Sequence, residues 1–194
     1  MRRMTEGNRR RAAGFTLIEA LIVITIIGIV AGFGIPRLST ARYKADAAAR
    51  LVRMQMQLAQ RNAITRQSNQ VVNFDLTNNK VIIVQDYNNN DTLDVNDRQI
   101  GRHLEEGTKF VRPTWAGPDG VTPSAAVTGT SLNTFGGLQG VIFRRDGSAS
   151  TDAMIYVTNR DAVKTEYRAI QLTQGTGKTD MYKWNGTTWI RMNQ

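Results

Sequence analysis

The hydrophobic pattern of the chain begins with one long apolar run and then changes to a helical stripe. Residues 15–35 read FTLIEALIVITIIGIVAGFGI, and Glu19 is the only charged residue among them. As a helix, a run of about 21 residues is long enough to cross roughly 30 Å of hydrocarbon. From 37 to 66, alanines and other apolar residues recur at spacings of three and four, which predicts an amphipathic helix with an arginine-rich exposed face.

A series of short alternating runs follows, which predicts strands separated by turn residues. Their expected ranges are 71–75, 80–86, 98–103, 108–112, 139–145, 153–158, 166–172, 179–184 and 187–191. Asn185-Gly186 favours a hairpin between the last two strands. Residues 113–137 are rich in Gly, Thr, Ser and Pro and are expected to form a long loop or an edge region. The predicted fold class is α+β, with a long N-terminal helix packed on an antiparallel β-sheet head.

Three ordinary interpretations of the apolar run compete: a secretory signal peptide, a plain membrane anchor and a buried soluble helix. The core of a signal peptide is usually about 7 to 15 residues long and is followed by a small-residue cleavage site, whereas this run is longer and leads into more helix. A single small domain can hardly cover so long an apolar helix. We therefore expect a membrane segment, with the preceding basic residues on the cytoplasmic side and the head across the membrane.

Glu19 is the residue that a plain anchor does not explain. A carboxylate in the apolar part of a membrane helix costs on the order of 2.5 to 3.5 kcal/mol on insertion scales, and such groups are usually paired. No other charge lies in the run. Cutting the chain between Gly14 and Phe15 would create an α-amine one helical turn from Glu19. In a stack of parallel helices, that amine could approach the carboxylate of a neighbouring subunit.

The sequence GFTLIE at 14–19 stands behind a basic leader and before an apolar run that ends at Pro36. This combination resembles the class III signal of type IV pilins and of the pseudopilins of type II secretion. The resemblance implies that a prepilin peptidase cuts after Gly14 and methylates Phe15, and that Glu19 guides assembly. Pro36 stands where pilins often carry a proline that kinks the helix.

The resemblance also implies how the chain is divided. The implied segments are a cleaved leader at 1–14, a transmembrane and filament-core helix at 15–36, an amphipathic helix at 37–66 and a β-rich head at 67–194. The order of elements in the head, with VIFRRDGSAS and GTGKTDMYKW within it, is similar to the GspH/FimT branch of minor pilins and pseudopilins.

A protein of this kind is a structural subunit and not an enzyme. The implied partners are other pilin or pseudopilin subunits, the prepilin peptidase, the inner membrane and its assembly platform. The implied location is the inner membrane, crossed once with the head in the periplasm, and afterwards a periplasmic or cell-surface filament. A DNA-binding minor pilin that serves DNA uptake is the alternative function.

The net charge changes this picture only slightly. A value of +9 suggests nucleic acid, but five arginines and one glutamate fall in the first 14 residues, which leaves +5 on the rest of the chain. Basic residues near aromatic ones can hold phosphates and stack bases. The candidates for DNA binding are Arg144, Arg145, Lys183 and Arg191. Interleaved acidic residues, and the packing of alternate aromatics on a hairpin, favour an ordinary sheet surface instead.

The segment 86–97, DYNNNDTLDVND, places oxygen side chains at the spacing of a calcium loop. The expected Ca²⁺ ligands are Asp86, Asn88, Asn90, Thr92 through its carbonyl, Asp94 and Asp97. Two departures count against calcium: Asp91 stands where the tight turn favours glycine, and Asp97 replaces the longer glutamate. A polar connection between two strands is the alternative interpretation, because asparagine and aspartate favour turns.

Signals for catalysis are weak. His103 is the only histidine, and no nucleophile lies near it in the sequence. The GTGKT segment at 175–179 lacks both the full spacing of a phosphate-binding loop and a following helix, so that it favours a hairpin turn. Without cysteine, neither a disulfide nor a thiolate metal site can form. A membrane-anchored enzyme would require a polar cleft with convergent reactive groups.

Overall fold

The computed structural model describes residues 16–34 and 40–192, which belong to two compact units that divide between residues 39 and 40. The first unit contains α1 (Leu17–Gly34). The second unit, the head, begins with α2 (Thr40–Arg66). Pro36, the predicted site of a kink, lies outside the described residues.

The head contains short strands in two antiparallel sheets. These are β1 (Asn69–Asp75), β2 (Lys80–Asp86), β3 (Arg98–His103), β4 (Thr108–Phe110), β5 (Val127–Gly129), β6 (Asn133–Phe135), β7 (Leu138–Phe143), β8 (Ala153–Asn159), β9 (Arg168–Thr173), β10 (Lys178–Trp184) and β11 (Trp189–Arg191), with the 3-10 turn η2 (Lys164–Glu166) before β9. Sheet A has the order β3-β2-β1-β7-β6. Sheet B has the order β11-β10-β9-β8-β4, and β5 also pairs with β8. The predicted α+β class, a helix on antiparallel sheet, is therefore confirmed.

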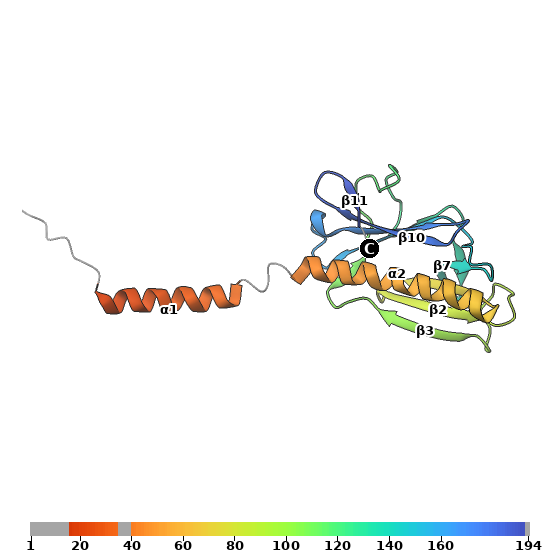
Figure 1. Ribbon diagram of the computed structural model, residues 1–194, viewed down its shortest axis with the longest axis horizontal. Helices are drawn as coiled ribbons and strands as arrows, with labels where there is room; N and C mark the ends of the chain where they lie inside the picture. Colours follow the sequence, from red (N-terminus) through yellow and green to blue (C-terminus); the bar gives the residue numbers. More distant parts are fainter. Residues whose placement is uncertain (1–15, 35–39, 193–194) are drawn as a thin grey trace, which may run out of the picture. The chain divides into compact units, whose positions relative to one another are not determined.

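The buried side of α2 is rich in alanine, which lets the helix lie close to both sheets. Its fully buried alanines include Ala48, Ala49, Ala59 and Ala63. They belong to one apolar core with Val72 and Phe74 of sheet A and with Ile155 and Leu172 of sheet B. Figure 1 shows α2 running along the head, with β10 and β11 on one side of it and β2 and β3 on the other. The helix thus joins the two sheets.

Sheet A is buried on both faces along its central strands. Val72 and Phe74 of β1 belong to the core beneath α2. The alternate residue Val71 belongs to a second cluster on the opposite face, with Phe135 and Ile142. Because successive side chains of a strand point to opposite faces, these two clusters explain why the strand sequences are apolar at consecutive positions.

The region 113–137, expected to be a loop or an edge, contains two strands. β5 pairs with β8, and β6 pairs with β7 so that Phe135 faces Leu138 across a two-residue turn. Both turn residues, Gly136 and Gly137, have positive φ angles of 59° and 79°. Such a turn favours glycine, which adopts a positive φ without the steric clash of a side chain. A Gly-Gly pair between two short runs is a hairpin signal, but the polar composition around it obscured the pattern.

Replacing Ala59 with leucine should lower the free energy of unfolding of the head by about 1 to 3 kcal/mol, because the larger side chain enters a filled core. Gln57→Leu adds a similar side chain at an exposed position of the same helix and is the matched control. Urea unfolding followed by circular dichroism measures both variants. Equal stabilities of the two variants would contradict the close packing of α2.

Candidate functional site

α1 begins with a capped first turn. The hydroxyl oxygen of Thr16 accepts a hydrogen bond from the backbone N–H of Glu19 at 3.3 Å, and the Thr16 carbonyl accepts from Ala20 at 3.2 Å. A threonine in this place satisfies a helix donor that would otherwise have no partner. Sequence reasoning missed this role, although Thr-x-x-Glu is the signature of a capping box. The predicted cleavage pair, Gly14 and Phe15, lies outside the described residues.

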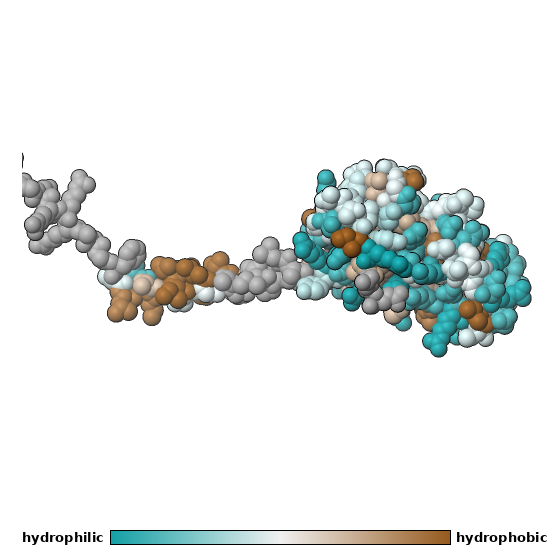
Figure 2. Space-filling model, turned by 45° about the horizontal axis from the view of Figure 1, so that its top comes forward, coloured by the Kyte–Doolittle hydropathy of each residue, from teal (hydrophilic) through white to brown (hydrophobic). Residues whose placement is uncertain are grey.

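The surface of α1 is apolar and exposed within its own unit. Leu17 and Val30 are 88% and 65% exposed, and most of the large aliphatic side chains between them are exposed as well. Figure 2 shows the visible side of this helix mainly in brown, the colour of hydrophobic residues. The hydroxyl of Thr25 donates to the Leu21 carbonyl at 2.8 Å, so that its polar group has a partner inside the helix. An apolar surface of this extent is typical of a contact with lipid or protein.

Glu19 carries the only charge of α1. It is exposed in the first turn, where the positive end of the helix dipole favours a carboxylate. Among the described residues, the Glu19 carboxylate forms no ion pair. Across residues 16–34 and 40–192, no helix combines the length and the apolar character that identify a membrane span.

In the head, the loop between β2 and β3 is held by Asp86. This side chain is fully buried, and its carboxylate accepts the backbone N–H groups of Asn90 at 3.2 Å and Asp91 at 2.9 Å. Asp91 accepts a hydrogen bond from the side-chain amide of Asn69 at 3.0 Å and pairs with Arg144 at 2.9 Å. The carboxylates therefore fold the loop and attach it to β1 and to the turn after β7.

The other expected calcium ligands also bond within the loop. Asn88 and Asn90 donate their side-chain N–H groups to Asp94 at 2.6 and 2.9 Å. Asp97 accepts the backbone N–H of Asp94 at 2.8 Å, and the Thr92 N–H donates to the Asn90 side-chain oxygen at 2.9 Å. In the described part of the chain, no three histidine, cysteine or acidic side chains are grouped to hold a metal ion. Calcium binding by this loop stays a prediction.

Replacing Asp86 with asparagine should lower the free energy of unfolding by about 1 to 3 kcal/mol, because two backbone N–H groups lose a charged acceptor in a buried place. Glu106→Gln removes a charge from an exposed position and is the control. Thermal unfolding of both variants in calcium and in chelator measures the effect.

An Asp86→Asn protein as stable as wild type would show that the carboxylate does not hold the loop. A melting temperature of the wild type that rises with calcium, and does not rise in Asp86→Asn, would establish the metal site.

The four residues expected to bind DNA lie in different sheets. Arg144 and Arg145 follow β7 of sheet A and line a polar hollow with Asn69. Lys183 and Arg191 lie on β10 and β11 of sheet B. Arg144 already pairs with a carboxylate of the loop between β2 and β3. The four residues therefore do not share one strand or one sheet.

Arg191 is also neutralised by a neighbour, Asp180 of β10. Partial burial raises the pKa of Asp180, but hydrogen bonds from Arg191 and Lys178 outweigh it, so that this pKa lies below its usual value. The same pairing raises the pKa of Arg191. The cation at this position therefore has a carboxylate at its side.

The aromatic residues of this hairpin pack against one another. Trp184 and Trp189 are paired across the hairpin, with 5.4 Å between their ring centroids. Trp184 also lies 5.3 Å from Trp115. The Tyr182 hydroxyl donates to the side-chain oxygen of Gln171 at 3.0 Å. These contacts use the rings for packing within the sheet, and DNA binding stays a prediction.

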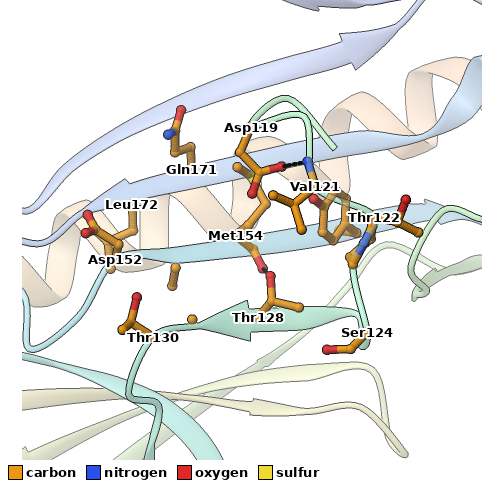
Figure 3. Close-up of a pocket in the computed structure, with 14 residues that line it drawn as sticks. Asp119, Val121, Thr122, Ser124, Thr128, Thr130, Asp152, Met154, Gln171 and Leu172 are labelled. Atoms are coloured by element: carbon orange, nitrogen blue, oxygen red, sulfur yellow. Dashed lines mark hydrogen bonds between the residues drawn. The ribbon is translucent and has the colours of Figure 1, made fainter. Parts of the chain in front are cut away.

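A cavity of about 610 Å³ lies over β5, β8 and β9, beneath the loop at 119–124 (Figure 3). Its two carboxylates already accept hydrogen bonds, Asp119 from the Val121 N–H at 3.1 Å and Asp152 from the Gln174 N–H at 2.8 Å. Burial and the charge of Asp119 raise the pKa of the Tyr156 hydroxyl well above its usual value. The described lining contains no histidine, lysine or cysteine. Its carboxylates therefore stabilise the surrounding loops.

The two segments considered for catalysis belong to strand ends. His103 lies at the end of β3, and its Nδ1 is 3.4 Å from the Asn78 carbonyl oxygen. In the GTGKT segment, Gly177 has a positive φ of 63°, and its N–H donates to the Thr173 carbonyl at 2.8 Å. Lys178 is the first residue of β10. The prediction of a hairpin turn is confirmed.

Comparison with solved structures finds the minor pseudopilin EpsH from the type 2 secretion system of Vibrio cholerae. Two of its structures match with TM-scores of 0.48 and with 12% and 14% sequence identity. The matches cover 71% and 72% of this chain and 95% and 94% of the EpsH chains. No curated protein matches the sequence.

The N-terminal residues match a known motif. The prokaryotic N-terminal methylation motif covers residues 9–35. This range contains Gly14, Phe15, Glu19 and all of α1. The chain therefore carries the N-terminal methylation motif of prokaryotes, and the motif includes the whole of α1.

Proposed function

We propose that the protein is a minor pilin or pseudopilin of the GspH/FimT branch, which joins a type IV pilus or a type II secretion filament through its N-terminal helix. One observation carries the proposal: the methylation motif covers a helix with exposed aliphatic side chains and a single charge, Glu19. In this proposal, a prepilin peptidase removes residues 1–14 and methylates the new amine of Phe15. The α+β head then forms part of the filament surface.

The apolar surface of α1 suits the helix to two environments. Covering an aliphatic side chain is worth about 1.5 to 3 kcal/mol relative to exposure in water. Lipid provides this cover before assembly, and the helices of neighbouring subunits provide it afterwards. Moving α1 from lipid to contact with other helices therefore changes the free energy of its apolar side chains little. Polar groups can then determine the position of the helix along the filament.

Glu19 is the polar group that sets the register in this proposal. Cleavage places a cationic amine on Phe15, one helical turn before Glu19. A subunit displaced along the filament can bring its own amine to this carboxylate and offset a cost on the order of 2.5 to 3.5 kcal/mol for an unpaired charge among apolar groups. In any other register, the Phe15 amine and the Glu19 carboxylate would not form an ion pair.

The proposed path runs from the inner membrane to a filament. The basic leader stays on the cytoplasmic side, so that the head lies in the periplasm. The inner-membrane assembly platform then moves the subunit into a periplasmic or cell-surface filament. In the alternative function, DNA uptake, affinity would depend on salt and fall when Arg145 or Lys183 is neutralised, because these residues form no ion pair in the described part of the head.

Replacing Gly14 with valine should block processing, because the peptidase cuts directly after this residue in the proposal. The wild type recovered from its native membrane should begin at N-methylated Phe15, and the variant should keep the leader. Ala12→Val makes a similar change two residues away and is the matched control. Intact mass and N-terminal sequencing distinguish the products. A wild-type chain that begins at Met1, or one cut beyond residue 35, would refute the proposal.

A further inference from the structure

An open strand edge in the head has no role in the proposed assembly of α1. β3 is the last strand of sheet A on one side, and in the described part of the chain no strand pairs with its outer edge. An edge strand presents backbone N–H and C=O groups that can bind a further strand. The side chains around this edge determine which sequence could pair with it.

Every second residue of β3 lies on the same side of the sheet as α2. Ile100 is paired in register with Ile83, which belongs to the core beneath α2. Because side chains alternate along a strand, Arg98 and Arg102 lie on this face too. All three β3 residues line a groove of about 440 Å³ between β3 and α2.

The centre of this groove is apolar. Met54 and Leu58 of α2 line it and are 56% and 44% exposed. Ile100 of β3 is 45% exposed, and Ile83 lies at the inner side of the groove. Exposed aliphatic side chains around one hollow are stabilised when another apolar group covers them.

The rim of the groove is basic. Arg66, Arg98 and Arg102 line it, and its lining contains no aspartate or glutamate. Arg66 donates to the side-chain oxygen of Gln85 at 2.8 Å. None of the three arginines forms an ion pair with a residue that the structure describes. A positive rim around an apolar centre is complementary to an aliphatic residue between carboxylates.

We propose that β3 pairs with an extended segment of another protein in which an aliphatic residue has an acidic residue two positions away on each side. The segment would add a strand to sheet A, and alternation would place all three side chains on the groove face. The aliphatic residue would lie beside Ile100 and the carboxylates beside Arg98 and Arg102. Arginines can also serve only to protect a strand edge from pairing. Protection alone does not account for the apolar hollow between these arginines and α2, whereas an aliphatic partner does.

Fluorescence anisotropy of a labelled peptide with the core Glu-Thr-Val-Thr-Glu tests this proposal on the full chain in detergent micelles. The peptide should bind the wild type about tenfold or more tightly than the Arg98→Gln/Arg102→Gln variant, which loses two charge-assisted contacts. Arg160→Gln changes an exposed arginine elsewhere on the head and should bind like wild type. Circular dichroism checks the fold of each variant.

Two altered peptides test the same site on the wild-type protein, so that the result does not depend on how a variant folds. A peptide with glutamine in place of both glutamates should bind about tenfold or more weakly, because the charges are lost. Methylating the backbone nitrogens that would face β3 should abolish binding, because strand pairing needs these donors.

No binding of the first peptide at millimolar concentration would overturn the proposal, as would equal affinity for the wild type and the double arginine variant. Binding that survives backbone methylation would exclude strand pairing. These measurements do not require leader cleavage or filament assembly, so their outcome is independent of the proposed function.

Discussion

The apolar surface of α1 is the constraint on which the proposed assembly depends. From Leu17 to Val30 its large aliphatic side chains are exposed within their own unit, and Glu19 is the helix's only charge. Water cannot stabilise such a surface, so lipid or other helices have to cover it. Because aliphatic contacts are similar in either environment, we propose that the one carboxylate supplies the specificity. The capping of the first turn by Thr16 fixes the backbone at that carboxylate.

The head must be stable without disulfides, since the chain contains no cysteine. α2 meets this need by placing buried alanines against both sheets. An ion pair joins Asp46 of α2 to Arg168 of β9, whose side chain is almost fully buried. Removing one partner of such a pair leaves a buried charge uncompensated, so the contact favours one position of the helix on sheet B. β3 remains at the edge of sheet A, where we propose that another protein binds.

Much of this fold could be predicted from alternation and turn residues. The ranges expected for β2 and β3 are those observed, because each strand lies between clear turn signals. β5 and β6 escaped notice because these short strands lie in a region rich in Gly, Thr, Ser and Pro, a composition typical of loops. The spacing of oxygens in the loop at 86–97 was visible, but not that Asp86 would accept backbone N–H groups. Pairs such as Asp46 and Arg168, 122 residues apart, depend on tertiary packing that local patterns do not contain.

Replacing Glu19 with glutamine in the native host tests most directly whether this carboxylate selects the place of the subunit in a filament. Ala20→Ser, a small change at the next residue, is the control. The measurement is the fraction of mature protein recovered in sheared or purified filaments relative to the membrane. If Glu19 has this role, Glu19→Gln should be cleaved before Phe15 like wild type but should stay in the membrane. Incorporation of Glu19→Gln at the wild-type level would contradict this role of Glu19.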